Sequence, residues 1–395
     1  MRGRLVEGRW AHDPAVYAPP RYRRGCSYEA FVPDTLAELP AIEPAVAGAI
    51  SAAEEAIREL NAVARPGLQP LARLLLRTES IASSKVEGMQ VDARSLARAE
   101  ARSDLGQTIG PEAAEILANI DAMQLAVADA TETDAFTLDH ILATHTALLA
   151  GAPNANEVAG VIRAGQNWIG GNDYNPCGAT FVPPPVEHVQ PLLDDLVAFC
   201  NDESLPPLMQ AALAHAQFET IHPFVDGNGR SGRALVQVVL RRRRIAPSYV
   251  PPISLVLAAD KDSYVNGLTD FRNGRENAWL RSFAVATARA AELAAGYLAR
   301  VQELQEEWRQ RLAPLGVRSD AAAWRLIDVL PGHPIISQPV AVEATGRTRP
   351  AIQQAIDQLV EVGVLNTLTT GKRNRHWEAA GLLNLSADFE TLSAR

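Results

Sequence analysis

A segment at residues 222–233, HPFVDGNGRSGR, is the feature that most restricts how this chain folds. An apolar, helix-like run at residues 234–240 follows directly, so the segment is expected to be a loop that opens a helix. Gly227 and Gly229 carry no side chains, which lets the backbone N–H groups of such a loop approach an anion closely. The positive end of the helix dipole would face the same anion. The segment therefore predicts a phosphate-binding loop at the start of a helix.

The polar side chains of this segment supply what a phosphoryl-type transfer needs. Arg230 and Arg233 are three positions apart and share a helix face, where both can hold phosphate oxygens. Asp226 offers a carboxylate of the kind that Mg²⁺ binds together with substrate phosphates. The His222 imidazole can accept a proton from an attacking hydroxyl at neutral pH. A lone Gly-x-Gly or His-Pro pair is usually only a turn, but the combination indicates an active site.

The segment matches the Fic family signature His-Pro-Phe-x-Asp-Gly-Asn-Gly-Arg-x-x-Arg at every specified position, and the chain resembles that family. Its members mostly transfer AMP from ATP to a Ser, Thr or Tyr hydroxyl of a target protein, and the resemblance implies that activity here, with ATP as substrate and Mg²⁺ as cofactor. The related Doc kinases carry a lysine and lack the second arginine, whereas this chain has Gly229 and Arg233. The implied roles are His222 as general base, Phe224 as buried anchor, Asp226 as Mg²⁺ ligand, Gly227, Asn228 and Gly229 as the anion hole, and Arg230 and Arg233 as ligands of the β- and γ-phosphates.

Residues 152–185 are rich in Gly, Asn and Pro and interrupt the helical pattern, as a short β-hairpin or flap would. They resemble the Fic flap, which holds the target segment by strand pairing and so depends little on the target's sequence. The expected flap contacts are Trp168, Ile169 and Gly170, with Trp168 or Ile169 pinning the acceptor side chain; core packing is the alternative for Trp168. Tyr264 and Asn273 fall where the family contacts the nucleoside, although both also suit packing or capping of a helix.

The segment SIASSKVEG at residues 80–88 places Ser83 and Glu87 four positions apart, on one face if it is helical, with Gly88 suited to the helix C-cap. A solvent-exposed helix face is the ordinary explanation of such a pair. Beside the Fic resemblance, the pair matches the inhibitory pattern Ser/Thr-x-x-x-Glu-Gly/Asn. That match implies autoinhibition, in which Glu87 pairs with Arg233 and occupies the cation that the γ-phosphate needs. An alternative is that Glu87 positions a water that removes AMP from modified targets.

Residues 317–385 show helical stretches, a glycine and two strand-like stretches in the order of a winged helix-turn-helix, and resemble the domain of that kind that follows many Fic cores. The expected recognition helix spans about 349–362, with a buried stripe of Ala351, Ile352, Ala355, Ile356 and Leu359. DNA contacts would come from Thr348, Arg349, Gln353, Gln354 and the basic stretch at 372–375. Residues 317–380 hold seven Lys or Arg against six Asp or Glu, so protein docking or dimerisation is the alternative to DNA binding.

The expected fold is mainly α: a Fic-type helical core with a short β-hairpin flap, followed by a C-terminal winged helix-turn-helix domain. The predicted divisions are residues 1–104 for an extended arm and helices, with the inhibitory helix at about 70–88, residues 105–312 for the catalytic core, and residues 317–385 for the C-terminal domain. His215 is expected to be structural. The four consecutive arginines at 241–244 are expected to complement a helix dipole while staying solvated.

Composition narrows the class of protein. The net charge of −9 argues against a general nucleic-acid coat, and no apolar run reaches the ~18 residues that span a bilayer, so no membrane partner is expected. Cys26, Cys177 and Cys200 are scattered without metal-site spacing. This pattern predicts a reducing, cytoplasmic setting without disulfides.

Two alternatives to AMP transfer remain open from the sequence. One is an enzyme of another reaction, either AMP removal or transfer of a different phosphate-linked group. The other is a DNA-binding regulator whose Fic-like core senses nucleotide; the full catalytic set argues against it, because a sensor has no need of His222. The sequence does not specify the target protein, self-modification is one option, and a homodimer is a common arrangement among similar proteins.

Overall fold

The structure is a computed structural model that describes residues 3–15, 17–37, 41–62, 69–152, 154–368 and 374–392. Its residue contacts form two compact units. The first unit consists of Met1–Ala52, Gln124–Ile245 and Lys261–Val285, and the second of Ala53–Met123, Ala246–Asp260 and Ala286–Arg395. Each unit therefore draws its core from separated stretches of the chain.

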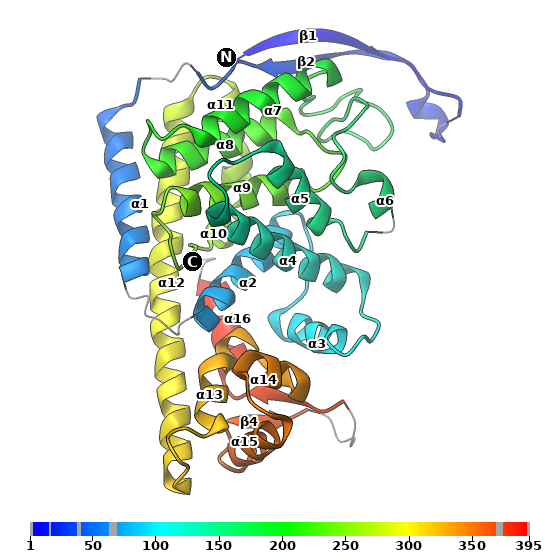
Figure 1. Ribbon diagram of the computed structural model, residues 1–395. Helices are drawn as coiled ribbons and strands as arrows, with labels where there is room; N and C mark the ends of the chain where they lie inside the picture. Colours follow the sequence, from blue (N-terminus) through cyan, green and yellow to red (C-terminus); the bar gives the residue numbers. More distant parts are fainter. Residues whose placement is uncertain are drawn as a thin grey trace. The chain divides into compact units, whose positions relative to one another are not determined.

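Helices make up most of the described chain, as expected, and its strands form two small antiparallel sheets (Figure 1). Helices α1 (Pro44–Ala62), α4 (Pro111–Glu132) and α12 (Glu276–Leu312) each contribute residues to both units. None of the described helices is long and apolar enough to cross a membrane. The remaining helices of the first unit are α5 (Leu138–Leu148), α6 (Ala155–Val158), α7 (Val186–Asn201), α8 (Pro207–Ile221), α9 (Asn228–Arg242) and α11 (Lys261–Arg272).

Helices α8 and α9 form the centre of the first unit. Every residue of α8 after Pro207 is buried, which is the pattern of a core helix covered on all sides. Helix α9 lies close against α8 because Gly232 has no side chain: a Cβ there would lie 2.5 Å from Glu219 Oε1. Trp279 of α12 donates from Nε1 to the Ala212 carbonyl of α8 at 2.9 Å. This packing fixes the two helix ends that the predicted active-site loop connects.

The N-terminal segment, expected as an extended arm, forms a paired β-hairpin instead (Figure 1). Strand β1 (Gly3–Trp10) pairs antiparallel with β2 (Cys26–Pro33), from Gly3 opposite Pro33 to Trp10 opposite Cys26. A single 3-10 turn, η1 (Pro20–Tyr22), lies in the connection between the strands. Charged residues and glycines interrupt the alternation of apolar side chains in β1, so the sequence pattern does not reveal the strand.

Cys26 and Cys177 form a disulfide with their Cα atoms 5.9 Å apart, so the expectation of a chain without disulfides is wrong. The two cysteines are 151 positions apart in the sequence. They meet because β2 runs beside the flap, where the Phe31 N–H donates to the Val182 carbonyl at 2.9 Å. Cys200 keeps its thiol; it is buried, and burial raises its pKa to about 12.

In the second unit, α2 (Gln69–Val86) packs against α10 (Ile253–Ala259) around a buried carboxylate. Glu79 of α2 is 1 % exposed and accepts the Ser254 N–H at 2.9 Å. The Ser254 hydroxyl donates to the same carboxylate. Because a buried carboxylate requires such donors, this contact fixes how α2 packs on α10.

The C-terminal part of the second unit contains the predicted helix, helix–Gly–helix and hairpin in that order. Gly346 ends α14 with φ +65°, in the backbone region that favours glycine. Of the predicted buried stripe of α15, Ala351 is half-buried and the other four residues are buried. Three short strands form one antiparallel sheet in the order β3–β5–β4. The elements of this part are α13 (Ala322–Val329), η3 (Leu330–Gly332), β3 (Ile335–Ser337), α14 (Gln338–Thr345), α15 (Arg349–Glu361), β4 (Leu365–Thr367), β5 (His376–Ala379) and α16 (Leu382–Leu392). Helix α3 (Ala93–Ser103) belongs to the same unit but lies earlier in the chain.

Candidate active site

The predicted active-site loop connects α8 to α9 and begins with a strained residue. His222 ends α8 in the left-handed region, with φ 49° and ψ 61°, and its N–H donates to the Phe218 carbonyl at 2.9 Å. Such a conformation costs a non-glycine residue about 1–3 kcal/mol, so surrounding contacts must hold it. The His222 carbonyl accepts from Arg163 Nε at 3.0 Å and from Asn167 Nδ2 at 3.3 Å. The backbone of the predicted general base is therefore fixed from outside the loop.

Arg163 is the residue that joins this loop to the flap. Its guanidinium donates to the carbonyls of His222, Gly165 and Pro184, at 3.0, 2.9 and 2.6 Å, and its backbone N–H donates to the Pro223 carbonyl at 2.9 Å. Arg163 is 3 % exposed, and burial lowers its pKa to about 10, so it stays charged at neutral pH. The His222 carbonyl lies 59 positions away along the chain, so this role is not visible in the sequence pattern.

Asn228 closes the loop with its side chain. Its Oδ1 accepts the Phe224 N–H at 2.8 Å, and its Nδ2 donates to the Phe224 carbonyl at 2.9 Å. Asn167 also donates to the Phe224 carbonyl, at 3.0 Å. The sequence assigned Asn228 to the anion hole; its side chain instead holds the loop together, while its backbone N–H lies at the start of α9.

Phe224 is fully buried, as an anchor should be, and its ring lies on a histidine that the sequence did not single out. The His145 and Phe224 rings are parallel within 4°, with their centroids 3.6 Å apart. His145 Nδ1 accepts the Gly160 N–H at 2.9 Å, so the proton is on Nε2, which donates to the Asp226 carbonyl at 3.0 Å. Burial, the largest cause, lowers the pKa of His145, which keeps this neutral tautomer. His145 thus positions both the anchor and the backbone of the predicted metal ligand.

The predicted phosphate ligands gather at the start of α9. Gly227 has φ +75° and precedes the helix, and a Cβ there would lie 3.0 Å from Leu148. Arg230 and Arg233 are each 2 % exposed, and Arg230 Nη2 lies 3.8 Å from Asp226 Oδ2. Two buried guanidinium groups beside the N–H groups of a helix N-terminus suit a polyphosphate.

Asp226 is the candidate Mg²⁺ ligand. Its side chain is 70 % exposed, and Oδ1 accepts the Gly227 N–H at 2.6 Å. Among the residues that the structure describes, no group of three His, Cys, Asp or Glu side chains could hold a metal on its own. One exposed carboxylate beside a phosphate-binding helix fits an ion that is held jointly by Asp226, substrate phosphates and water.

The flap is anchored by a β-bridge between Ile169 and Phe181. Gly170 and Gly171 follow with φ +77° and +78°, and a Cβ on Gly170 would lie 2.4 Å from Thr180 Oγ1, so this turn requires glycine. Ile169 is 37 % exposed. Its position is therefore compatible with a contact to a target segment.

Trp168 packs within the protein. Its ring lies edge-on to Trp10 of β1 at 5.4 Å, and its Nε1 donates to the Asn172 carbonyl at 2.6 Å. These contacts favour the packing alternative for this residue over a contact with the acceptor side chain.

The two nucleoside candidates differ in their surroundings. Tyr264 is 7 % exposed, and its hydroxyl lies 2.9 Å from His215 Nε2. Burial, followed by the charge of Arg233, lowers the pKa of His215 to about 3, so this histidine is a neutral core residue, as expected. Asn273 lies exposed beyond the end of α11, where its N–H donates to the Thr269 carbonyl at 3.0 Å.

The candidate inhibitory residues lie at the end of α2 in the second unit. Ser83 is buried within the helix, whereas α2 ends at Val86 and Glu87 follows in an exposed turn. The Glu87 N–H donates to the Ser84 carbonyl at 3.1 Å. Gly88 has φ +92°, as expected of a residue that ends a helix. Of the predicted pair, Ser83 therefore lies in the helix, whereas Glu87 lies just beyond its end.

The arginines at the end of α9 are less solvated than expected. Arg242 donates to the carbonyls of Thr133 and Asp134, at 3.1 and 2.9 Å. Arg243 donates to Gln210 Oε1 at 2.6 Å and to the Leu205 carbonyl at 2.9 Å. Both side chains stay partly exposed and also bind carbonyl groups of nearby loops.

The candidate DNA-reading residues lie on and around α15. Thr348, Arg349 and Gln354 are exposed, whereas Gln353 accepts from Gln338 Nε2 at 3.1 Å. Of the basic stretch at 372–375, residues 372 and 373 lie outside the described part of the chain. Arg375 is half-buried, with its guanidinium 5.1 Å from the centre of the Trp377 ring.

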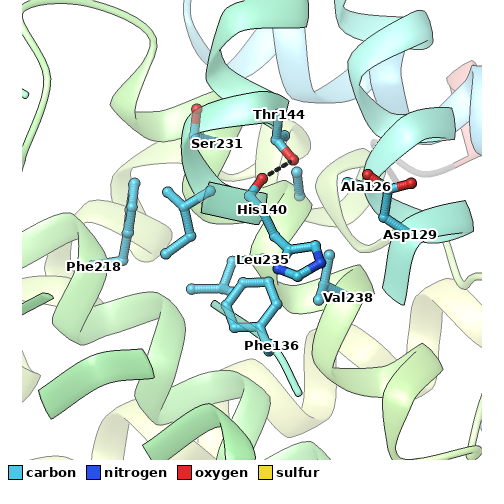
Figure 2. Close-up of a pocket in the computed structure, with 11 residues that line it drawn as sticks. Ala126, Asp129, Phe136, His140, Thr144, Phe218, Ser231, Leu235 and Val238 are labelled. Atoms are coloured by element: carbon cyan, nitrogen blue, oxygen red, sulfur yellow. Dashed lines mark hydrogen bonds between the residues drawn. The ribbon is translucent and has the colours of Figure 1, made fainter. Parts of the chain in front are cut away.

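A small cavity beside α9 in the first unit does not suit a nucleotide (Figure 2). Its volume is about 10 Å³, enough for one water molecule. Figure 2 shows the side chains of Phe136, His140, Leu235 and Val238 around this mostly apolar space. This cavity is therefore not the nucleotide site that the sequence predicts.

Comparisons with known proteins find similar sequences over two parts of the chain. The Fic/DOC family model matches residues 135–240, and the model of the Fic/DOC family N-terminal region matches residues 47–128. Protein adenylyltransferase fic-1 of Caenorhabditis elegans is 36 % identical over 124 residues, which cover 30 % of this chain and 22 % of that protein. Protein adenylyltransferase Fic of Drosophila virilis is 35 % identical over 140 residues, covering 35 % and 27 %. The chain thus aligns with about a quarter of the length of these relatives.

Solved structures share the fold. A Fic family protein from Desulfovibrio desulfuricans G20 superposes with a TM-score of 0.50 at 21 % identity, over 87 % of this chain and 98 % of that one. Fic-1 (aa134 - 508) from C. elegans gives a TM-score of 0.52 at 22 % identity, over 65 % and 73 %. At these identities the likeness establishes the arrangement of the chain and no more.

Proposed function

This chain belongs to the Fic/DOC family, and from that premise we propose that it is a Mg-ATP-dependent protein adenylyltransferase. The observation that carries the proposal is the loop between α8 and α9. It brings His222, the Asp226 carboxylate and the N-terminus of α9 onto one short, tightly held segment. A helix N-terminus suited to phosphates beside a single imidazole favours phosphoryl-type chemistry.

In the proposed reaction, the hydroxyl oxygen of a target residue attacks the α-phosphorus of ATP. The bond between that phosphorus and the oxygen that bridges to the β-phosphorus breaks, and diphosphate leaves with the electron pair. The His222 imidazole takes the hydroxyl proton. Arg230, Arg233 and the N–H groups at the start of α9 hold the β- and γ-phosphates. Asp226 would hold Mg²⁺, which neutralises charge on the leaving diphosphate.

The rigid surroundings of the loop support this role. Transfer to a weak nucleophile depends on holding the base, the phosphate and the hydroxyl in line, and misplacement of one partner costs orders of magnitude in rate. Arg163 and Asn167 fix the carbonyl of His222, and Asn228 closes the loop around Phe224. The side chains of these three residues thus hold the backbone around the proposed base in place.

Intact-mass spectrometry tests the proposed activity. Incubation with Mg-ATP and a protein extract should add the mass of AMP to target proteins, or to this chain itself. His222→Ala should lower the rate by about 10²–10⁴-fold, the usual contribution of a general base. His188→Ala, on α7, is the matched control and should label like the unmodified protein. Equal labelling by His222→Ala would contradict the assigned base, and a mass increase of one phosphate would show a kinase instead.

The autoinhibition that the sequence implies belongs to the same proposal. Glu87 would compete with the γ-phosphate for Arg233, so ATP would bind in a pose unsuited to attack on its α-phosphorus. The support is the residue pattern at 83–88 and the turn that leaves Glu87 exposed beyond α2. Glu87→Gln keeps the size of the side chain and removes its charge, so it should raise AMP transfer if charge is what inhibits.

A further inference from the structure

The connection between β1 and β2 carries a cluster of positive charge on an otherwise acidic protein. We name it the basic tip: Arg21, Arg23 and Arg24, all of which are exposed. Residues 11–25 contain these three arginines and one acidic residue, Asp13, whereas the whole chain has a net charge of −9. Within the described part of the chain the three guanidinium groups have no carboxylate partner. Arg23 Nε donates to the Ala18 carbonyl at 2.7 Å, which keeps the turn in shape.

The basic tip is fastened to the flap by contacts of several kinds. The Cys26–Cys177 disulfide joins the end of the connection to the flap covalently. The Tyr22 and Tyr174 rings stack with centroids 5.1 Å apart, and Asn175 Nδ2 donates to the Tyr22 carbonyl at 2.8 Å. Holding an exposed turn in one conformation costs conformational entropy, which contacts outside the turn must offset. These contacts therefore fix where the positive charge lies relative to the flap.

The flap leads in turn to the active-site loop. Asn167 donates to the carbonyls of His222 and Phe224, at 3.3 and 3.0 Å, and Ile169 follows two residues later with its side chain partly exposed. All of these residues belong to the first unit. A continuous series of contacts thus runs from the basic tip through the flap to the predicted base.

We propose that the basic tip and the flap form one docking surface, which binds an acidic segment of the target protein beside its acceptor hydroxyl. This inference rests on the proposed function. Backbone pairing at the flap selects little among target sequences, whereas three exposed guanidinium groups on one fastened turn select for carboxylates and can bind them in bidentate fashion. A nucleic acid is the less suitable partner, because three phosphate contacts give weak, salt-sensitive binding and do not use the flap.

Fluorescence anisotropy with a defined probe tests the surface without requiring catalysis. The probe is a fluorescein-labelled dodecapeptide with four glutamates around one serine, and a second peptide has glutamine in place of each glutamate. The glutamate peptide should bind the full chain more tightly, and added salt should weaken it. Arg21→Glu/Arg24→Glu should weaken its binding about tenfold, while Arg21→Lys/Arg24→Lys should retain most of it, since each exposed charge pair contributes modestly.

A charge-matched control separates local from general electrostatics. Arg281→Glu/Arg318→Glu changes the net charge by the same amount at two other exposed positions and should bind the peptide normally. Equal binding of the two peptides would overturn the docking surface. So would a finding that Arg281→Glu/Arg318→Glu weakens binding of the glutamate peptide as much as the double substitution in the basic tip does. Tighter binding of a labelled single-stranded oligonucleotide at the basic tip would overturn it in favour of a nucleic-acid partner. Charge-dependent peptide binding without AMP transfer would contradict the proposed function alone.

Discussion

The ring of His145 lies flat on the ring of Phe224, and its two nitrogens bind the backbone at Gly160 in the flap segment and at Asp226 in the active-site loop. Replacement by leucine keeps the volume but leaves the Gly160 N–H and the Asp226 carbonyl without partners. Each buried group left unsatisfied costs about 1–3 kcal/mol. His145→Leu should therefore lower the free energy of unfolding and reduce AMP transfer, measured by urea unfolding and labelled ATP. Unchanged stability and rate would show that the loop does not depend on His145.

Gly232 sets the distance between α8 and α9. Gly232→Ala would place a Cβ 2.5 Å from Glu219 Oε1, so one helix or the glutamate must move, at a cost of about 1–3 kcal/mol. Gly48→Ala, at an exposed helical position with nothing within 4 Å, is the matched control and should be stabilising by up to about 1 kcal/mol. The midpoint temperature of thermal unfolding should fall for Gly232→Ala and rise for Gly48→Ala. A neutral Gly232→Ala would contradict the close packing of these helices.

Most of the long helices and several helix-ending glycines could be predicted from the sequence, because both depend on neighbouring residues. The loop-to-helix change at Gly227, the helix end at Gly88 and the cap at Gly346 each follow from a few neighbouring residues. The roles of Arg163 and His145 could not be predicted, because the carbonyl groups that they bind lie tens of positions away in the sequence. Neither residue belongs to a local sequence motif that would have pointed to its role.

The hairpin and the disulfide were missed for a related reason. The number and spacing of cysteines indicate whether a protein folds in a reducing or an oxidising compartment. They do not show which cysteines the fold brings together. Cys26 and Cys177 meet only because β2 runs beside the flap.

The Cys26–Cys177 disulfide should stabilise the first unit. Closing long loops with a disulfide typically contributes about 2–4 kcal/mol, so a dithiol reductant should lower the midpoint of thermal unfolding. Cys26→Ser/Cys177→Ser should unfold at the lower temperature with or without reductant. The buried Cys200 remains in both proteins and serves as the internal control for other thiol effects. An equal response of both proteins to the reductant would contradict this assignment.

Acid should destabilise the fold through its buried histidines. Burial lowers the pKa of His215 to about 3 and that of His333 to about 4, whereas an unfolded histidine titrates near ~6.5. Below about pH 6.5 the unfolded chain binds protons that the folded chain does not, so stability falls with pH by up to ~1.4 kcal/mol per pH unit for each histidine. Urea unfolding between pH 7 and pH 5 measures this slope. His215→Gln should make the slope shallower, and an unchanged slope would show that His215 does not contribute.

ATP labelled at either its α- or its γ-phosphorus tests the central claim most directly. The Glu87→Gly variant, freed of the proposed inhibition, is incubated with each label, with and without the additional substitution His222→Ala. The α-label should become covalently attached to protein and the γ-label should leave with diphosphate, and His222→Ala should slow the attachment by about 10²–10⁴-fold. Attachment of the γ-label, or attachment of the α-label at an equal rate without His222, would contradict AMP transfer by this loop.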